Sequence, residues 1–162
     1  MSQSLFLISS FFGALMASLK TAMALLLLFS STALGDSGQL FLNVYVDGTP
    51  GKALVVGNVD DISGLAFLNT ADKIYENNGQ LYAVCDSLVE KDGNGWRLSF
   101  PASGYFDEYH AVFFVSGGFA FQEINCTEGL EILSSAYNGS IVLDVQGFGL
   151  TDPAVSFSYA AM

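Results

Sequence analysis

The sequence predicts a single all-β domain, an antiparallel β-sandwich or barrel of about 8–10 short strands that follows an N-terminal signal peptide. Apolar residues alternate with polar or aromatic residues at a period of two, and glycine, asparagine or aspartate breaks this alternation about every eight to twelve residues. No stretch after residue 35 keeps a convincing helical period over about eleven residues. Many short strands separated by turn residues are typical of sandwiches and barrels.

The first predicted strand covers residues 39–46, where aliphatic side chains occupy every second position, and residues 47–51 form the turn that ends it. The best helical candidate is the short segment 70–77. Turns are expected at residues 90–94 and 116–118. The other predicted strands, rich in β-branched or aromatic residues, are 53–56, 64–68, 80–85, 95–100, 110–115, 119–124, 130–133, 140–145 and 154–159.

Residues 1–35 have the pattern of a secretory signal. Lys20 supplies the positive charge, residues 22–29 the apolar segment, and residues 30–35 the small residues that a signal peptidase requires. We therefore expect cleavage to leave residues 36–162 as the mature domain.

Two other features bear on the membrane. Residues 1–15 add an uncharged apolar stretch that a signal does not need, which makes Met16 a possible true start. The alternative interpretation is an uncleaved signal anchor. Each apolar block is shorter than the roughly twenty residues of a bilayer span, and serines interrupt the last predicted strand, so we expect no stable membrane anchor.

The chain is strongly acidic, with 5 Lys and Arg residues against 16 Asp and Glu residues. Removal of residues 1–35 takes away Lys20 and none of the acids. A surface of this charge repels phosphate backbones, so nucleic acid is excluded as a partner. It also disfavours anionic membrane surfaces.

Cysteine usage and sequons fit an exported protein. Cys85 and Cys126 are the two cysteines, and in an oxidising compartment an even pair predicts a disulfide. Two glycosylation sequons begin at Asn125 and Asn138, the second within a predicted turn. Two cysteines and the single histidine, His110, are too few for a zinc site, so we expect no metal and no cofactor.

The candidate ligand-binding residues are four aromatic side chains near the predicted turn at residues 101–104: Trp96, Tyr105, Phe106 and Tyr109. Flat sugar faces pack on aromatic planes, and such a patch beside acidic residues suits a carbohydrate. Alternatively, Trp96 is a core residue of its strand, whereas Tyr105 and Tyr109 are expected to be more open.

No catalytic centre is expected. Residues 35–38 match the nucleophile loop of trypsin-like proteases, but Ser37 lies at the predicted cleavage junction and has no base held against it. Acidic residues that could serve a glycosidase or bind calcium lie mainly in predicted turns, where solvent explains them. Glu123 and Asp144 lie inside predicted strands, where they either face water or are buried for a purpose.

Residues 80–85, an apolar strand ending in cysteine, and residues 95–98, which contain Trp96, resemble part of the small secreted cell-wall and effector proteins of fungi. The similarity covers about twenty residues. It implies a non-catalytic β-domain associated with a wall or surface.

These features predict a secreted, disulfide-stabilised, glycosylated β-domain with a non-enzymatic role in the cell wall, at a surface, or as an effector. The expected partner is a wall polysaccharide or a protein of a host or cell surface. The alternatives are a carbohydrate-binding module, which would present exposed coplanar aromatic residues on one sheet face, and a small acidic glycoside hydrolase, which would need two carboxylates in one cleft.

Overall fold

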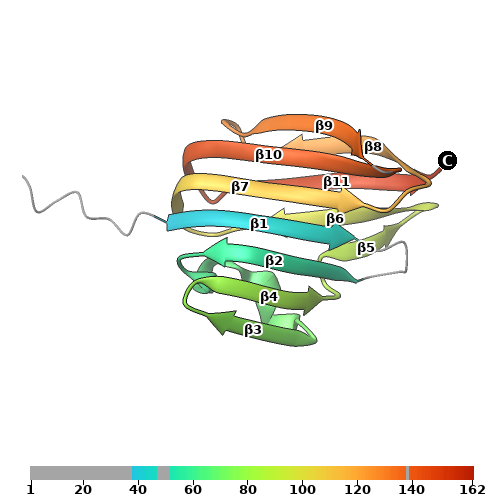
Figure 1. The fold of residues 1–162 in the computed structure, drawn as a ribbon. Coiled ribbons are helices and arrows are strands. Elements are labelled where there is room, and N and C mark those ends of the chain that lie inside the picture. The colour runs from blue at the N-terminus through green and yellow to red at the C-terminus, as the bar shows by residue number, and fades with distance from the viewer. Residues whose placement is uncertain (1–37, 47–51, 138) are drawn as a thin grey trace, which may run out of the picture. The chain divides into compact units, whose positions relative to one another are not determined.

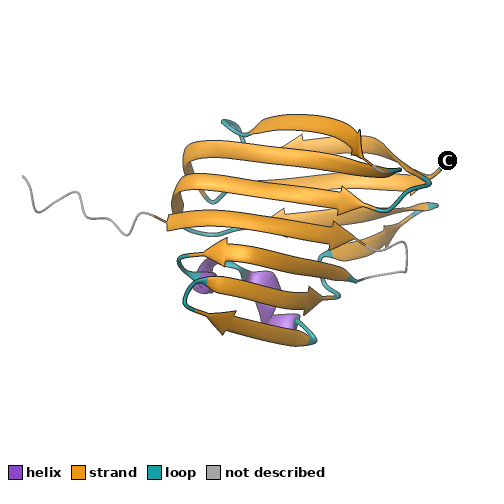
Figure 2. Cartoon of the chain, viewed as in Figure 1, coloured by secondary structure: helices purple, strands orange, loops and turns teal. Residues whose placement is uncertain are grey.

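The computed structural model describes residues 38–46, 52–137 and 139–162, which form a two-sheet β-sandwich (Figure 1, Figure 2). The all-β prediction is confirmed. The two sheets have seven and four strands and do not close into a barrel. Both belong to one compact unit, which runs from Ser37 to Met162.

The larger sheet has the strand order β3-β4-β2-β1-β7-β10-β9. Its strands are β1 (Gly38–Val46), β2 (Ala53–Val59), β3 (Lys73–Asn77), β4 (Gln80–Cys85), β7 (Tyr105–Val115), β9 (Glu131–Tyr137) and β10 (Ser140–Thr151). All neighbours are antiparallel except β1 and β7, which run parallel. The first strand of the domain therefore lies in the middle of the sheet.

The smaller sheet has the order β5-β6-β11-β8, and all its strand pairs are antiparallel. Its strands are β5 (Val89–Asp92), β6 (Gly95–Pro101), β8 (Phe119–Cys126) and β11 (Ala154–Ala161). The chain passes from one sheet to the other after β4, β6, β7, β8 and β10, so five of the ten connections between described strands join the two sheets.

The core lies between the sheets and follows from the period of two. Leu40, Leu42 and Val44 of β1 point inward, as every second residue of a strand with one covered face must. Aromatic rings join the layers: Phe113 of β7 contacts Phe157 of β11 edge-to-face, with ring centroids 5.4 Å apart. Phe113 also meets Phe100 of β6 in the same way, at 5.5 Å.

Residues 64–68 were predicted to form a strand, and this is wrong. They belong to two 3-10 helices, η1 (Ile62–Gly64) and η2 (Ala66–Thr70). Asp61 caps η1 by accepting a hydrogen bond from the Ser63 amide, and Phe67 is buried. A short apolar run has the same composition in a buried strand and in a buried helical turn, so the pattern did not separate them.

The segment 70–77, which was the best helical candidate in a chain predicted to be all-β, is not a helix, because β3 occupies residues 73–77. Asn78 and Gly79 connect β3 to β4 with φ angles of 51° and 78°. Positive φ at both central residues defines a type I′ hairpin turn, whose twist matches the paired strands. The turn therefore favours a hairpin where the apolar spacing indicated a helix.

Candidate functional site

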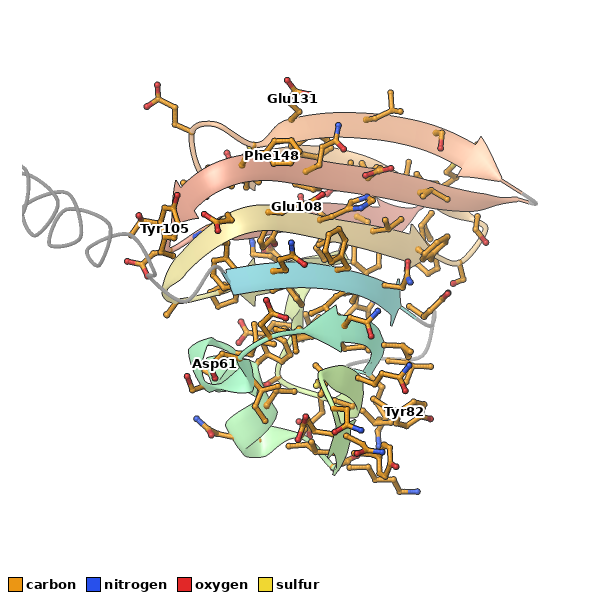
Figure 3. All side chains as sticks on the ribbon, turned by 60° about the vertical axis from the view of Figure 1, so that its left-hand side comes forward. Asp61, Tyr82, Tyr105, Glu108, Glu131 and Phe148 are labelled. Carbon is orange, nitrogen blue, oxygen red and sulfur yellow. The ribbon has the colours of Figure 1, made fainter. Side chains whose placement is uncertain are left out.

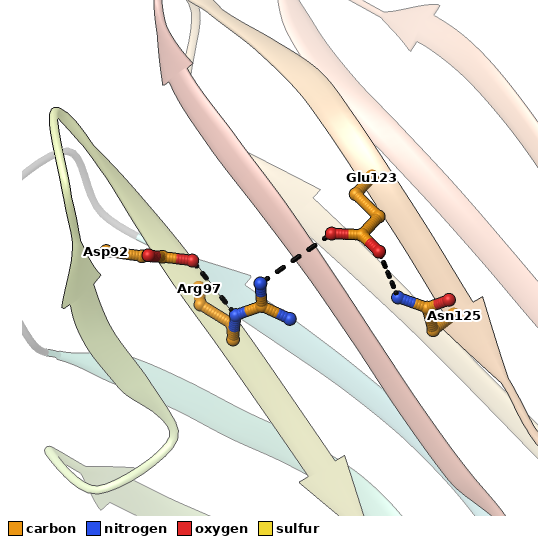
Figure 4. A network of polar contacts seen from close by, with 4 residues as sticks. All are labelled: Asp92, Arg97, Glu123 and Asn125. Atoms are coloured by element: carbon orange, nitrogen blue, oxygen red, sulfur yellow. Dashed lines mark hydrogen bonds and ion pairs between the residues drawn. The ribbon is translucent and has the colours of Figure 1, made fainter.

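The two outer faces of the sandwich differ in chemistry. On the small sheet the outward side chains are polar, and Arg97 lies among them with acids on both sides (Figure 4). Its Nε lies 3.0 Å from Asp92 Oδ2, and its Nη2 lies 3.7 Å from Glu123 Oε2. Asn125 Nδ2 donates to Glu123 Oε1 at 3.0 Å. The three charged side chains are each more than a third exposed, so water screens their interactions.

The outward side chains of the seven-stranded sheet, called here the outer face, are instead rich in aromatic and aliphatic residues. Strand register places Tyr75 directly opposite Tyr82, followed across the sheet by Val56 and Asn43. Tyr75 is 61% exposed and Tyr82 is 44% exposed. Tyrosines with this exposure form a surface that a ligand can reach.

The next row of the outer face contains a stacked pair of rings. Tyr45 of β1 and Phe114 of β7 are register partners in the parallel pair, with ring centroids 4.8 Å apart and planes 12° from parallel. Tyr45 is 44% exposed, so one part of this stack faces solvent. Beside it lies a hollow of about 440 Å³, whose lining includes Leu54 and Val84 and the polar residues Lys52 and Ser140.

A polar centre follows on the same face. His110 Nε2 lies 2.8 Å from Asp144 Oδ1, and both side chains are more than a third exposed. The ring of Phe41 meets the His110 ring edge-to-face at 6.2 Å. Strand register places Asn43 of β1, Val112 of β7 and Asp144 of β10 in one row across the sheet. These groups can donate and accept hydrogen bonds between the aromatic residues.

Two further aromatic residues lie toward the opposite end of the outer face. Phe148 pairs with Glu108 across β10 and β7, and Tyr105 pairs with Thr151 (Figure 3). Phe148 is 69% exposed and Tyr105 is 53% exposed. Tyr75 and Phe148 are five strand intervals apart, which at about 4.8 Å for each interval is about 24 Å. The exposed aromatic side chains therefore extend across most of the large sheet.

The four aromatic residues predicted as a patch do not form one. Tyr109 and Phe106 are buried in the core, and Trp96 is half-buried against it. Only Tyr105 is exposed. Its hydrogen bond to Asp107 raises the pKa of the Tyr105 hydroxyl.

The expectation that Tyr109 is open is wrong because β7 begins five residues before the predicted strand. Its inward series Tyr109, Ala111, Phe113 and Val115 is continuous in the structure. No described residue offers a hydrogen-bond partner to the buried Tyr109 hydroxyl. Burial raises the pKa of this phenol well above its usual value.

The predicted disulfide is also corrected. Cys85 is buried at the end of β4 in the large sheet, whereas Cys126 is exposed at the end of β8 in the small sheet. Both are free thiols. Cysteine count and compartment indicate only that a pair can form, and they carry no information on which strands the two residues occupy.

The remaining predicted sites lie as follows. Asn125 is exposed on the small sheet, and Asn138 lies outside the described residues. Glu123 and Asp144, which were singled out as acids inside predicted strands, belong to different sheets. No three His, Cys, Asp or Glu side chains gather as a metal site requires in the ranges 38–46, 52–137 and 139–162.

Sequence reasoning missed the outer face itself. Its signal was present in strands whose residues are apolar on both faces, such as Val112 to Val115. Such runs usually belong to strands covered on both sides. Here one side is covered by the small sheet, and on the other side Val112 and Phe114 are only half-buried.

Comparison with known proteins gives no relative: no family model matches the chain, and neither a curated protein nor a solved structure is similar to it. In the described part of the chain, no helix has the length and apolar character needed to cross a membrane.

Proposed function

We propose that this chain is an exported, non-enzymatic binding domain whose outer face binds a neutral polysaccharide of a cell wall or surface. The observation that carries the proposal is the set of exposed tyrosines on one sheet face, with Tyr75 and Tyr82 side by side and Tyr45 stacked on Phe114. Contiguous exposed apolar surface on a sandwich whose other face is polar marks an interaction site.

The chemistry of the face suits sugar rings. The C–H face of a pyranose packs on an aromatic plane, while its hydroxyl groups need partners that both donate and accept. Asn43, His110 and Asp144 supply such partners next to the aromatic residues. The face has the mixture of apolar area and few polar groups that ligand sites use.

Charge favours a neutral ligand. The formal net charge of the chain is −11, and Glu108, Glu131 and Asp144 lie on or beside the outer face. An anionic polysaccharide would meet repulsion there. A neutral β-linked glucan or chitin avoids this cost.

Export fits the same role. The signal pattern of residues 1–35 directs the chain to the compartment where wall polysaccharides occur. A glycan on Asn125 would extend from the small sheet, on the other side of the sandwich from Tyr75 and Tyr82. Glycosylation at that site leaves the outer face free.

The test is a binding assay with insoluble β-glucan, chitin and a polyuronate as probes. The protein should be depleted from solution by a neutral polysaccharide and not by the polyuronate. The double variant Tyr75→Ala, Tyr82→Ala should bind about 25-fold more weakly, since about 1 kcal/mol for each ring is about fivefold in affinity.

Ile74→Ala is the matched control. Ile74 lies on β3 next to Tyr75, is 47% exposed, and points to the opposite side of the strand. The control should bind as the parent does, and thermal unfolding of each variant checks the fold. Absence of binding to every probe, or an unchanged affinity in the double variant, contradicts the proposal. Release of soluble sugar by the purified protein would indicate a hydrolase instead.

A further inference from the structure

The four edge strands of the sandwich are not protected equally. An edge strand exposes unpaired N–H and C=O groups, and proteins usually block it with charged residues, proline, a bulge or a short length. β3 carries Lys73 and Glu76, and β5 is four residues long with three of them charged. β8 carries Glu123, and its pairing with β11 contains a register shift.

β9 has none of these protections along most of its length. Residues 132–136 are Ile, Leu, Ser, Ser and Ala, and all five are exposed. The only charged residue of the strand is Glu131, at its first position. Leu133 is 68% exposed on the outer face, next to Asp144 of β10. β9 is therefore the edge at which another strand can be added.

We propose that β9 pairs with β9 of a second copy of this chain, in antiparallel register about a two-fold axis through Ser134. Centring on Ser134 pairs all seven residues of the strand, so that Leu133 lies opposite Ser135 of the second copy and Ile132 opposite Ala136. The two-fold axis is perpendicular to the sheet, so residues that point outward in one copy lie opposite residues that point outward in the other copy.

The charge pattern of β9 fits a copy of itself. In this register the two Glu131 residues lie at opposite ends of the ladder, about 20 Å apart at about 3.4 Å for each residue. Between them no charged side chain meets another, because residues 132–136 are uncharged. Polar Ser134 pairs with its own equivalent, and serine pairs across strands form hydrogen bonds.

The contact is small. A seven-residue strand is about 24 Å long, and an edge-to-edge pair buries less than the roughly 1,200–2,000 Å² of stable interfaces. The dimer is therefore expected to be weak, forming at high protein concentration and dissociating on dilution. It would join two seven-stranded sheets into one continuous sheet, with both outer faces on the same side.

The test is sedimentation of the purified protein over a concentration series. The weight-average mass should rise from that of one chain toward that of two. Ser134→Lys places two like charges opposite each other at the axis and should weaken association at least about tenfold. Ser134 is exposed, so thermal unfolding should be unchanged.

Ser99→Lys is the matched control, since Ser99 is an exposed strand serine on β6 of the small sheet, and the change in net charge is the same. It should dimerise as the parent does. A parent that remains one chain up to about 1 mM overturns the proposal. Association of Ser134→Lys equal to that of the parent also overturns it, because the contact would then lie elsewhere.

Discussion

The two cysteines differ in exposure, and this difference predicts a large gap between their rates of reaction with a thiol reagent. Cys85 is fully buried, and burial, with smaller contributions from Asp86 and Asp72, raises its pKa from 9.0 to about 11. The thiolate is the reactive form. At pH 8 a thiol with a pKa of about 11 is ionised in about one molecule in a thousand. Cys126 is exposed and open to the reagent.

The size of the gap follows from the two routes by which Cys85 can react. In the folded domain it is almost entirely protonated and is covered by the core. Through global unfolding, a domain stable by about 5 kcal/mol or more is open in fewer than about one molecule in a thousand. The rise in pKa from 9.0 to about 11 lowers the thiolate fraction at pH 8 by about a hundredfold, and burial slows the reaction of the folded domain further. Cys85 should therefore react at least about a hundredfold more slowly than Cys126.

The assay is alkylation at pH 8 followed by intact mass, first in buffer and then in denaturant without reductant. One addition should be rapid, and the second should require denaturant. Cys126→Ser should remove the rapid addition and keep the slow one. Failure of either thiol to react in denaturant means that a disulfide joins them, and equal rates in buffer mean that β4 does not bury Cys85.

Two further predictions concern stability. Tyr109→Phe should raise the free energy of unfolding by about 1–2 kcal/mol, because it removes a buried hydroxyl for which no described residue is a partner; Tyr82→Phe, at an exposed ring, should change it little. Urea unfolding measures both, and a loss of stability in Tyr109→Phe would mean that the hydroxyl is satisfied. Gly64→Ala should lower the free energy of unfolding by about 2–4 kcal/mol, because an added Cβ would clash with the Ser103 carbonyl oxygen. An unchanged free energy of unfolding would contradict this close approach.

Much of the fold could be predicted because the period of two is a local property. The strands around residues 39–46 and 80–85 have boundaries within one residue of those predicted, since turn residues flank them. The helical turns at residues 62–70 could not be predicted, because they depend on burial under the large sheet. The burial of Tyr109 also depends on the small sheet that covers β7, which the local sequence does not show.

The candidate site was less predictable than the fold. The choice of aromatic residues followed a single stretch of chain, whereas the outer face combines Tyr45, Tyr75, Tyr82 and Phe114 from four strands. Only strand order and register bring these residues together. The partnership of His110 with Asp144, 34 positions apart, depends on the same register.

The parallel pairing of β1 with β7 has a consequence for how the domain forms. β1 is the first strand of the described residues to be synthesised. One of its two neighbours is β7, residues 105–115, so the middle of the large sheet cannot close until most of the chain exists. Contacts so distant along the chain make folding slow. The amino-terminal boundary is equally sensitive, because trimming past Gly38 shortens a central strand and not an exposed edge. Loss of all of residues 38–46 would separate β2 from β7 and divide the sheet into two parts.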